Sequence, residues 1–244
     1  MVPSRDLPLI RRLVRDIVGD DRRAASVFEH HGIEYCCDVT ATLGEACARA
    51  SADLASVQAD LRQTEARPPA ASPTPAWDLD QVVAYLVDRH HRYVRDTLPL
   101  LRAWCTRLIL RHGHARPELS AVATLVEDLD TELSMHLVKE EQILVPWLVR
   151  MAEAFRSRQP PEPGPFGTIL HPIRAMEAEH ERIEHIVEKL RTLAGTLEPP
   201  AERCVTWGLF WQEVARFDED LRAHVQVEHN VLFARALELE RLLG

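Results

Sequence analysis

The sequence predicts an all-α protein, in which a small all-helical domain precedes an up-down-up-down four-helix bundle. Two observations lead to this fold class. Apolar residues recur at spacings of three and four, without an alternating strand pattern, along four long segments of the second part of the chain. Helix-breaking runs rich in proline and glycine separate these segments. The expected helices of the bundle span roughly residues 78–112, 118–156, 167–196 and 200–242.

Short helices are expected in the first domain, residues 1–65. Their ranges are 7–18, 21–31, 42–51 and 53–64, with breaks at Gly19-Asp20 and in the loop from Gly32 to Thr40. A helical domain of this size lies near the lower limit for independent folding. Because a second buried surface would stabilise it, a homodimer formed through this domain is a further expectation.

Residues 66–76 form a proline-rich run that cannot be helical, and we interpret it as an extended interdomain linker. The bundle then occupies residues 77–244. Its first helix has a recognisable start. Asp78 is expected to cap this helix and Gln81 to return the hydrogen bond, while Trp77 packs on Val82.

Composition and charge exclude several classes of function. The net charge of -9 and the pI near 5.7 argue against binding to nucleic acid, because no basic stripe offsets them. No apolar run approaches the length needed to span a bilayer, and the amino terminus does not resemble a signal segment, so no membrane association is expected. Five cysteines without the spacing of a disulfide framework indicate a reducing compartment. We therefore expect a cytoplasmic protein.

Four histidines of the second domain lie at nearly equal intervals. Helix-breaking runs fall near the midpoints of these intervals, near residues 113, 158 and 202. In an up-down-up-down bundle, a turn midway between two residues places them at the same height. The pattern therefore predicts one layer that contains His91, His136, His180 and His224.

Glutamates follow two of these histidines at a distance of four residues, as Glu140 and Glu228. On a helix, residues four apart share a face and lie about 6 Å apart along the axis. Four imidazoles and two carboxylates suit two iron or manganese ions that are bridged by the carboxylates. A single zinc ion would leave two or more of these ligands unused, so zinc is less expected.

Neighbouring residues leave the ligand set open at this point. His90 competes with His91, Glu141 with Glu140 and His229 with His224, and Glu184 forms a third His-x-x-x-Glu pair with His180. Helical phase favours Glu140 over Glu141. The inward face of the second helix is expected to contain Leu129, Leu133, His136, Glu140 and Leu144.

The motifs around these histidines resemble those of a known family. Residues 133–146, Leu-Ser-Met-His-Leu-Val-Lys-Glu-Glu-Gln-Ile-Leu-Val-Pro, resemble the second-helix motif of hemerythrin-like di-iron proteins, and more narrowly that of the repair-of-iron-centres (RIC) family. Residues 176–180 and 224–233 resemble the third and fourth motifs. His90-His91, followed by Pro99, resembles the first.

The first domain resembles the same family independently. Residues 25–37 resemble its amino-terminal domain, which carries a Tyr-Cys-Cys motif, here Tyr35-Cys36-Cys37. Asp38-Val39 stand where the family usually has Gly-Gly, so the backbone freedom of that turn is reduced. A disulfide between adjacent cysteines is strained. Cys36 and Cys37 are therefore either one buried and one inert exposed thiol, or a redox or transfer site.

The resemblance implies a hemerythrin-like bundle with two iron ions that share an oxo or hydroxo bridge. It implies a protein that repairs iron–sulfur clusters after nitrosative or oxidative stress, by iron donation or nitric oxide reduction, with iron–sulfur proteins as clients. Glu132 and Glu179 match family carboxylates that could relay protons or line a channel. The alternative is a non-enzymatic sensor or carrier of dioxygen, nitric oxide or iron. The implied iron ligands are His91, His136, Glu140, His180, His224 and Glu228.

Overall fold

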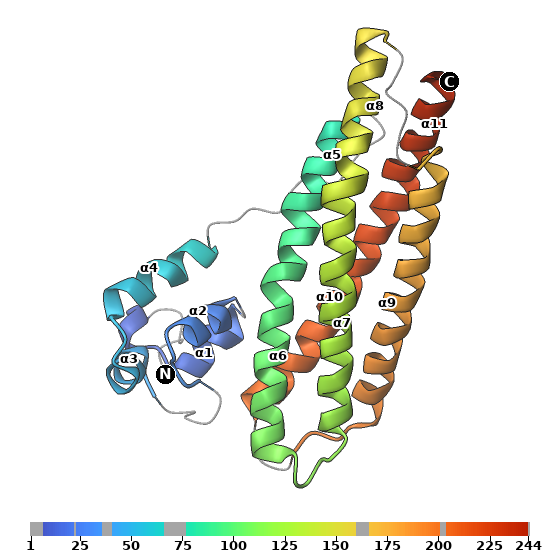
Figure 1. The fold of residues 1–244 in the computed structure, drawn as a ribbon. Coiled ribbons are helices and arrows are strands. Elements are labelled where there is room, and N and C mark those ends of the chain that lie inside the picture. Colours follow the sequence, from blue (N-terminus) through green and yellow to red (C-terminus); the bar gives the residue numbers. More distant parts are fainter. Residues whose placement is uncertain are drawn as a thin grey trace. The chain divides into compact units, whose positions relative to one another are not determined.

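The computed structural model describes residues 7–21, 23–35, 41–65, 77–159, 166–200 and 204–243, and every regular element in these ranges is a helix (Figure 1). The all-α prediction is confirmed. The chain divides into two compact units, one of Met1–Pro69 with Glu198–Gln212 and one of Ala70–Leu197 with Glu213–Gly244. The proline-rich run 66–76 lies outside the described residues. The domain boundaries stay a prediction.

Short helices make up the amino-terminal part of the first unit. They are η2 (Leu9–Arg11), α1 (Val14–Asp20), α2 (Ala24–His30), α3 (Leu43–Ala50) and α4 (Leu54–Glu65). A capping box starts α3, where Thr42 and Glu45 exchange hydrogen bonds between side chain and backbone. The fully buried side chains Phe28, Ile33 and Tyr35 contribute to the core of this unit.

The single helix expected over residues 7–18 is wrong, because Arg12 and Leu13 are extended. The backbone here bonds to another segment instead of continuing a helix: Leu43 N donates to Arg12 O at 2.9 Å and Val14 N to Ala41 O at 3.1 Å. This isolated bridge satisfies backbone groups that a helix would otherwise pair locally. Helix α1 also continues through Gly19 and ends where Asp21 becomes extended.

The second unit contains most of the long helices, and their bounds agree with the predicted ranges. The first consists of α5 (Leu79–Tyr85), η3 (Leu86–His91) and α6 (Arg92–His112), and the second of α7 (Leu119–Lys139), η4 (Glu140–Leu144) and α8 (Val145–Ser157). The third is α9 (Leu170–Thr196), and the fourth consists of α10 (Val205–Val227), η5 (Glu228–Phe233) and α11 (Ala234–Leu243). Helix α7 packs between α6 and α9 (Figure 1). The capping box of Asp78 and Gln81 is present as expected.

Segments η3, η4 and η5 are π-helical, which differs from the regular α-helices expected from the apolar spacing. A π turn contains one more residue than an α turn and therefore shifts the helical phase. Segment η3 ends at His91, while η4 and η5 begin at Glu140 and Glu228. Pro146, just after η4, has no N–H to continue the regular backbone pattern. Each π segment thus lies at a predicted metal ligand.

A hydrophobic cluster of this unit includes residues of the π segments themselves and of the helices next to them. It contains Leu86 of η3, Leu148 and Met151 of α8, and Phe233 of η5, all nearly inaccessible to solvent. Trp77 packs against the cluster that includes Val82. Among the described residues, no helix combines the length and apolar character required to cross a membrane.

Candidate metal centre

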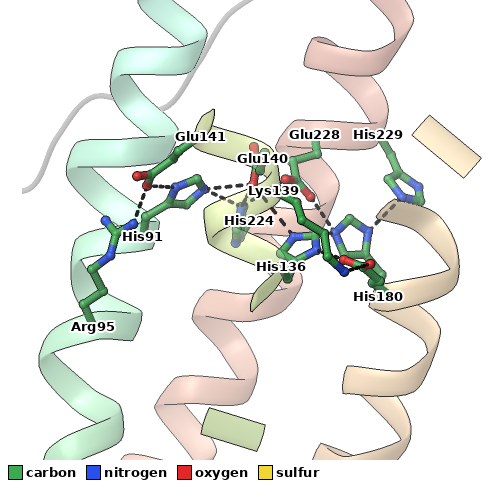
Figure 2. A network of polar contacts seen from close by, with 11 residues as sticks. His91, Arg95, His136, Lys139, Glu140, Glu141, His180, His224, Glu228 and His229 are labelled. Carbon is green, nitrogen blue, oxygen red and sulfur yellow. Dashed lines mark hydrogen bonds and ion pairs between the residues drawn. The ribbon is translucent and has the colours of Figure 1, made fainter. Parts of the chain in front are cut away.

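Six buried side chains from four helices meet in one layer of the second unit (Figure 2). The imidazoles come from η3, α7, α9 and α10, and the carboxylates come from the first residues of η4 and η5. His180 is 8% exposed, whereas each of the other five is at most 1% exposed. The six side chains are His91, His136, Glu140, His180, His224 and Glu228.

The four imidazoles form two pairs through their Nε2 atoms. His91 Nε2 lies 3.2 Å from His224 Nε2, and His136 Nε2 lies 3.2 Å from His180 Nε2. In each pair, the two nitrogens that face each other could bind the same cation. The expected layer of four histidines is therefore present, and it is divided into two halves.

The two carboxylates lie between these halves. Glu140 Oε2 is 3.2 Å from His91 Nε2 and 3.8 Å from His136 Nε2. Glu228 places Oε2 3.0 Å from His180 Nε2 and Oε1 3.2 Å from His224 Nε2. The donor atoms form two groups within 4.8 Å, one of His91, Glu140, His224 and Glu228 and one of His136, His180 and Glu228.

The hydrogen bonding of the carboxylates fits a pair of cations. Both side-chain oxygens of Glu140 and both of Glu228 are buried and have no hydrogen-bond partner. A buried carboxylate without a partner is strongly destabilising. Two divalent cations between the histidine pairs would neutralise both charges with donor atoms that iron and manganese accept.

The pKa values in the layer reflect competition between burial and the neighbouring charges. Burial lowers the pKa of His136 to about 4, so this imidazole is neutral at pH 7. Burial disfavours the charged form of His91 too, but the neighbouring carboxylate of Glu140, 3.2 Å from its Nε2, prevails and raises its pKa. Burial and the charge of Glu228 raise the pKa of Glu140. Burial also acts against ionised Glu228, yet His224 and His180 hold its pKa well below the usual value.

Carboxylates hold the outer nitrogens of two of the four imidazoles. His91 Nδ1 lies 2.7 Å from Glu141, which also accepts a hydrogen bond of 2.7 Å from Arg95. His136 Nδ1 lies 3.1 Å from Glu179, which also accepts a hydrogen bond from Lys139. A carboxylate at Nδ1 keeps the proton there, so Nε2 is free to bind a metal.

The other two imidazoles contact histidines instead. His180 Nδ1 lies 3.4 Å from His229 Nε2. The ring of His224 stacks on that of His90, with 5.4 Å between centroids and 7° between planes. His90 Nδ1 in turn lies 2.9 Å from Asp220.

Residues 82–236 match the family described as the hemerythrin HHE cation binding domain. This match covers more than half of the chain. The chain belongs to the hemerythrin HHE family. Residues 10–65 match ScdA_N, a domain of unknown function. Both parts of the expected family resemblance are thereby confirmed.

Relatives of this hemerythrin HHE protein include proteins named iron-sulfur cluster repair protein YtfE. The protein of Musicola paradisiaca (strain Ech703) is 33% identical over 221 residues, which cover 89% of this chain and 92% of the relative. That of Citrobacter koseri is 30% identical over 215 residues, which cover 88% and 91%. That of Salmonella newport (strain SL254) is 31% identical with the same coverage.

The residues predicted for the site of this hemerythrin HHE protein differ in burial and in their contacts with the metal layer. The inward face expected for the second helix, Leu129, Leu133, His136, Glu140 and Leu144, is buried. Glu179 contacts His136, as given above. Glu132 is half-buried and lies 3.4 Å from Arg182, which is also 3.8 Å from Glu179. Glu184 is exposed. Cys36 and Cys37 lie outside the described residues.

Three contacts in the layer were not foreseen, those of Glu141, His90 and His229. Each of these residues is the direct sequence neighbour of a predicted ligand, and each was expected only as an alternative ligand, with His229 as the alternative to His224. Each contacts a ligand on another helix instead: Glu141 contacts His91, His229 contacts His180, and His90 contacts His224. The signal was present as the doublets His90-His91, Glu140-Glu141 and Glu228-His229.

Proposed function

We propose that this chain is a di-iron protein that repairs iron–sulfur clusters damaged by nitrosative or oxidative stress. The observation that carries the proposal is the pair of buried donor groups that share Glu228. They lie in a chain that aligns over 89% of its length with an iron-sulfur cluster repair protein. Neither donor group has enough exposed surface to be an incidental cluster of surface charges.

The donor set divides naturally between two iron ions. His91 and His224 would hold one ion, His136 and His180 would hold the other, and the carboxylates of Glu140 and Glu228 would bridge them. Two iron ions in this layer would supply redox capacity and open coordination positions for small ligands such as nitric oxide or dioxygen. Manganese accepts similar donors, so measurement of the bound metal distinguishes the two.

The protein itself orients the donors and keeps water away. Glu141 and Glu179 each accept a hydrogen bond from a ligand imidazole at Nδ1, which directs Nε2 into the layer. Arg95 and Lys139 neutralise these outer carboxylates, so each remains ionised. Consistent with this, burial alone would raise the pKa of Glu179, but the contacts with Lys139 and His136 lower it.

The repair step is proposed to be iron donation to damaged clusters, nitric oxide reduction, or both, with iron–sulfur proteins as clients. One experiment measures metal content, nitrous oxide formation and the recovery of an iron–sulfur enzyme that nitric oxide has inactivated. We expect two iron ions in the anaerobically purified wild-type chain and recovery of the client. His136→Ala should abolish both, because it removes one ligand of the second half.

Glu184→Ala is the matched control, since Glu184 completes a His-x-x-x-Glu pair with His180 but is exposed. This variant should retain iron and repair. Reversible binding of nitric oxide with neither client recovery nor nitrous oxide would instead identify a carrier and refute the proposal. The expected cytoplasmic location, the homodimer and the role of Cys36 and Cys37 stay predictions.

A further inference from the structure

The four ligand imidazoles differ in which group covers the side that faces away from the metal layer. At His91 and His136, a carboxylate paired with a cation covers Nδ1. At His224, the covering group is the ring of His90, which is only 2% exposed. None of these three arrangements offers an incoming cation an exposed neutral donor.

His180 is the exception among the four. It is the most exposed of the six predicted ligands, and its Nδ1 lies 3.4 Å from Nε2 of the exposed residue His229. Figure 2 shows His229 on the outer side of His180, away from the other ligands. An imidazole at the surface is a suitable first ligand for a divalent iron ion.

The π-helical segment η5 produces this arrangement. Its first two residues, Glu228 and His229, approach the same imidazole from opposite sides: Glu228 Oε2 is 3.0 Å from His180 Nε2, while His229 lies at Nδ1. Phe233 of the same segment backs both rings, with its centroid 6.4 Å from that of His180 and 5.5 Å from that of His229. One helical segment thus supplies an inner carboxylate, an outer imidazole and an apolar wall.

We propose that His229 is the surface ligand through which iron ions enter and leave the layer, with transfer past His180 to Glu228. This inference rests on the proposed function, because it assigns the route by which a di-iron protein is filled and donates iron. The transfer involves no change of oxidation state. An iron(II) ion exchanges water for His229, and then exchanges His229 for the inner donors.

The proposal differs from a purely supporting role for His229 in what it predicts. A surface ligand accelerates uptake and release equally and leaves the affinity unchanged, because it lowers the barrier in both directions. An outer residue that only orients a ligand changes the metal affinity, typically by about 10- to 100-fold. Rates and affinity measured together therefore separate the two roles.

The test compares His229→Gln with His185→Gln in the full-length chain. Glutamine retains a side-chain amide that can bond to His180 but is a poor iron ligand. His185 is the matched control, because it is a 65% exposed histidine on α9 whose ion pair with Glu188, at 3.9 Å, is loose. Anaerobic iron(II) uptake by the metal-free chain and release to a chromogenic chelator are followed, along with final stoichiometry and affinity.

In His229→Gln, we expect uptake and release to slow by a common factor of about ten, on the scale of outer-ligand effects, with unchanged stoichiometry and affinity. His185→Gln should match the wild type. Wild-type rates in His229→Gln, equal slowing in the control, or a weaker affinity with faster release would each overturn the inference. A wild-type chain that binds no iron would refute the proposed function itself. If the wild type binds iron but His229→Gln takes up and releases iron at wild-type rates, only the proposed route is refuted.

Discussion

The two sides of the metal layer hold the same kind of ligand in different ways. On the side of η3 and α7, His91 and His136 each donate to a carboxylate that is itself paired with a cation. On the side of α9 and α10, His180 and His224 contact other imidazoles. Each half of the layer combines one ligand from each side. Each metal position would thus have one imidazole oriented by a carboxylate and one that contacts another imidazole.

Removal of Glu228 should have the largest effect, because this carboxylate belongs to both donor groups. We expect Glu228→Ala to lose both metal ions, whereas Glu184→Ala retains two per chain. Metal analysis after gel filtration measures the outcome. Retention of one tightly bound ion by Glu228→Ala would show that the two halves bind metal independently.

Acidification should release metal strongly. The pKa values of His91 and His180 are raised in the metal-free chain, through their contacts with Glu140 and Glu228, against the effect of burial. Protons therefore compete with metal at these nitrogens from above the usual histidine pKa of about 6.5. Affinity should fall by about tenfold per pH unit for each proton displaced. Titration of bound metal between neutral and mildly acidic pH measures this slope, and a flat response would contradict it.

Weakening one of the carboxylate contacts should lower metal affinity without abolishing binding. Glu179→Gln replaces the charged acceptor of His136 Nδ1 by a neutral amide, and we expect a loss of about 10- to 100-fold. Glu132→Gln is the control, since Glu132 contacts only the outer cation Arg182 among the interactions given above. Competition with a chelator of known affinity measures both variants. Equal losses would make Glu132 a functional partner of the site.

The smallest effect on metal affinity is expected on the opposite side of the layer. His90→Phe retains a flat ring against His224 and leaves Arg89 to pair with Asp220 at 3.0 Å. We expect its affinity loss to stay below that of Glu179→Gln, because no hydrogen bond to a ligand is removed. A loss as large as that of Glu179→Gln would break the distinction between the two sides.

The layer could be predicted from sequence because a regular interval and the positions of the helix breaks determine height in a bundle. The contacts around it could not. Glu141, His90 and His229 act on ligands of other helices, and helical phase within one segment carries no information about such pairs. The extended Arg12 and Leu13 were missed for the same reason, since their neighbours bond to residues about thirty positions later.

The π-helical segment η4 separates two requirements on one continuous helix. Before it, His136 must face the metal layer; after it, Leu148 and Met151 must face the hydrophobic cluster. An α-helix turns by about 100° per residue, so if the same residues formed an uninterrupted α-helix, the extra residue of the π turn would rotate all of α8 by roughly that angle relative to α7. The apolar stripe of α8 would then turn toward solvent although every contact of the metal layer was still encoded. The π-helical conformation of this segment, and not only its composition, is therefore needed for the packing of α8.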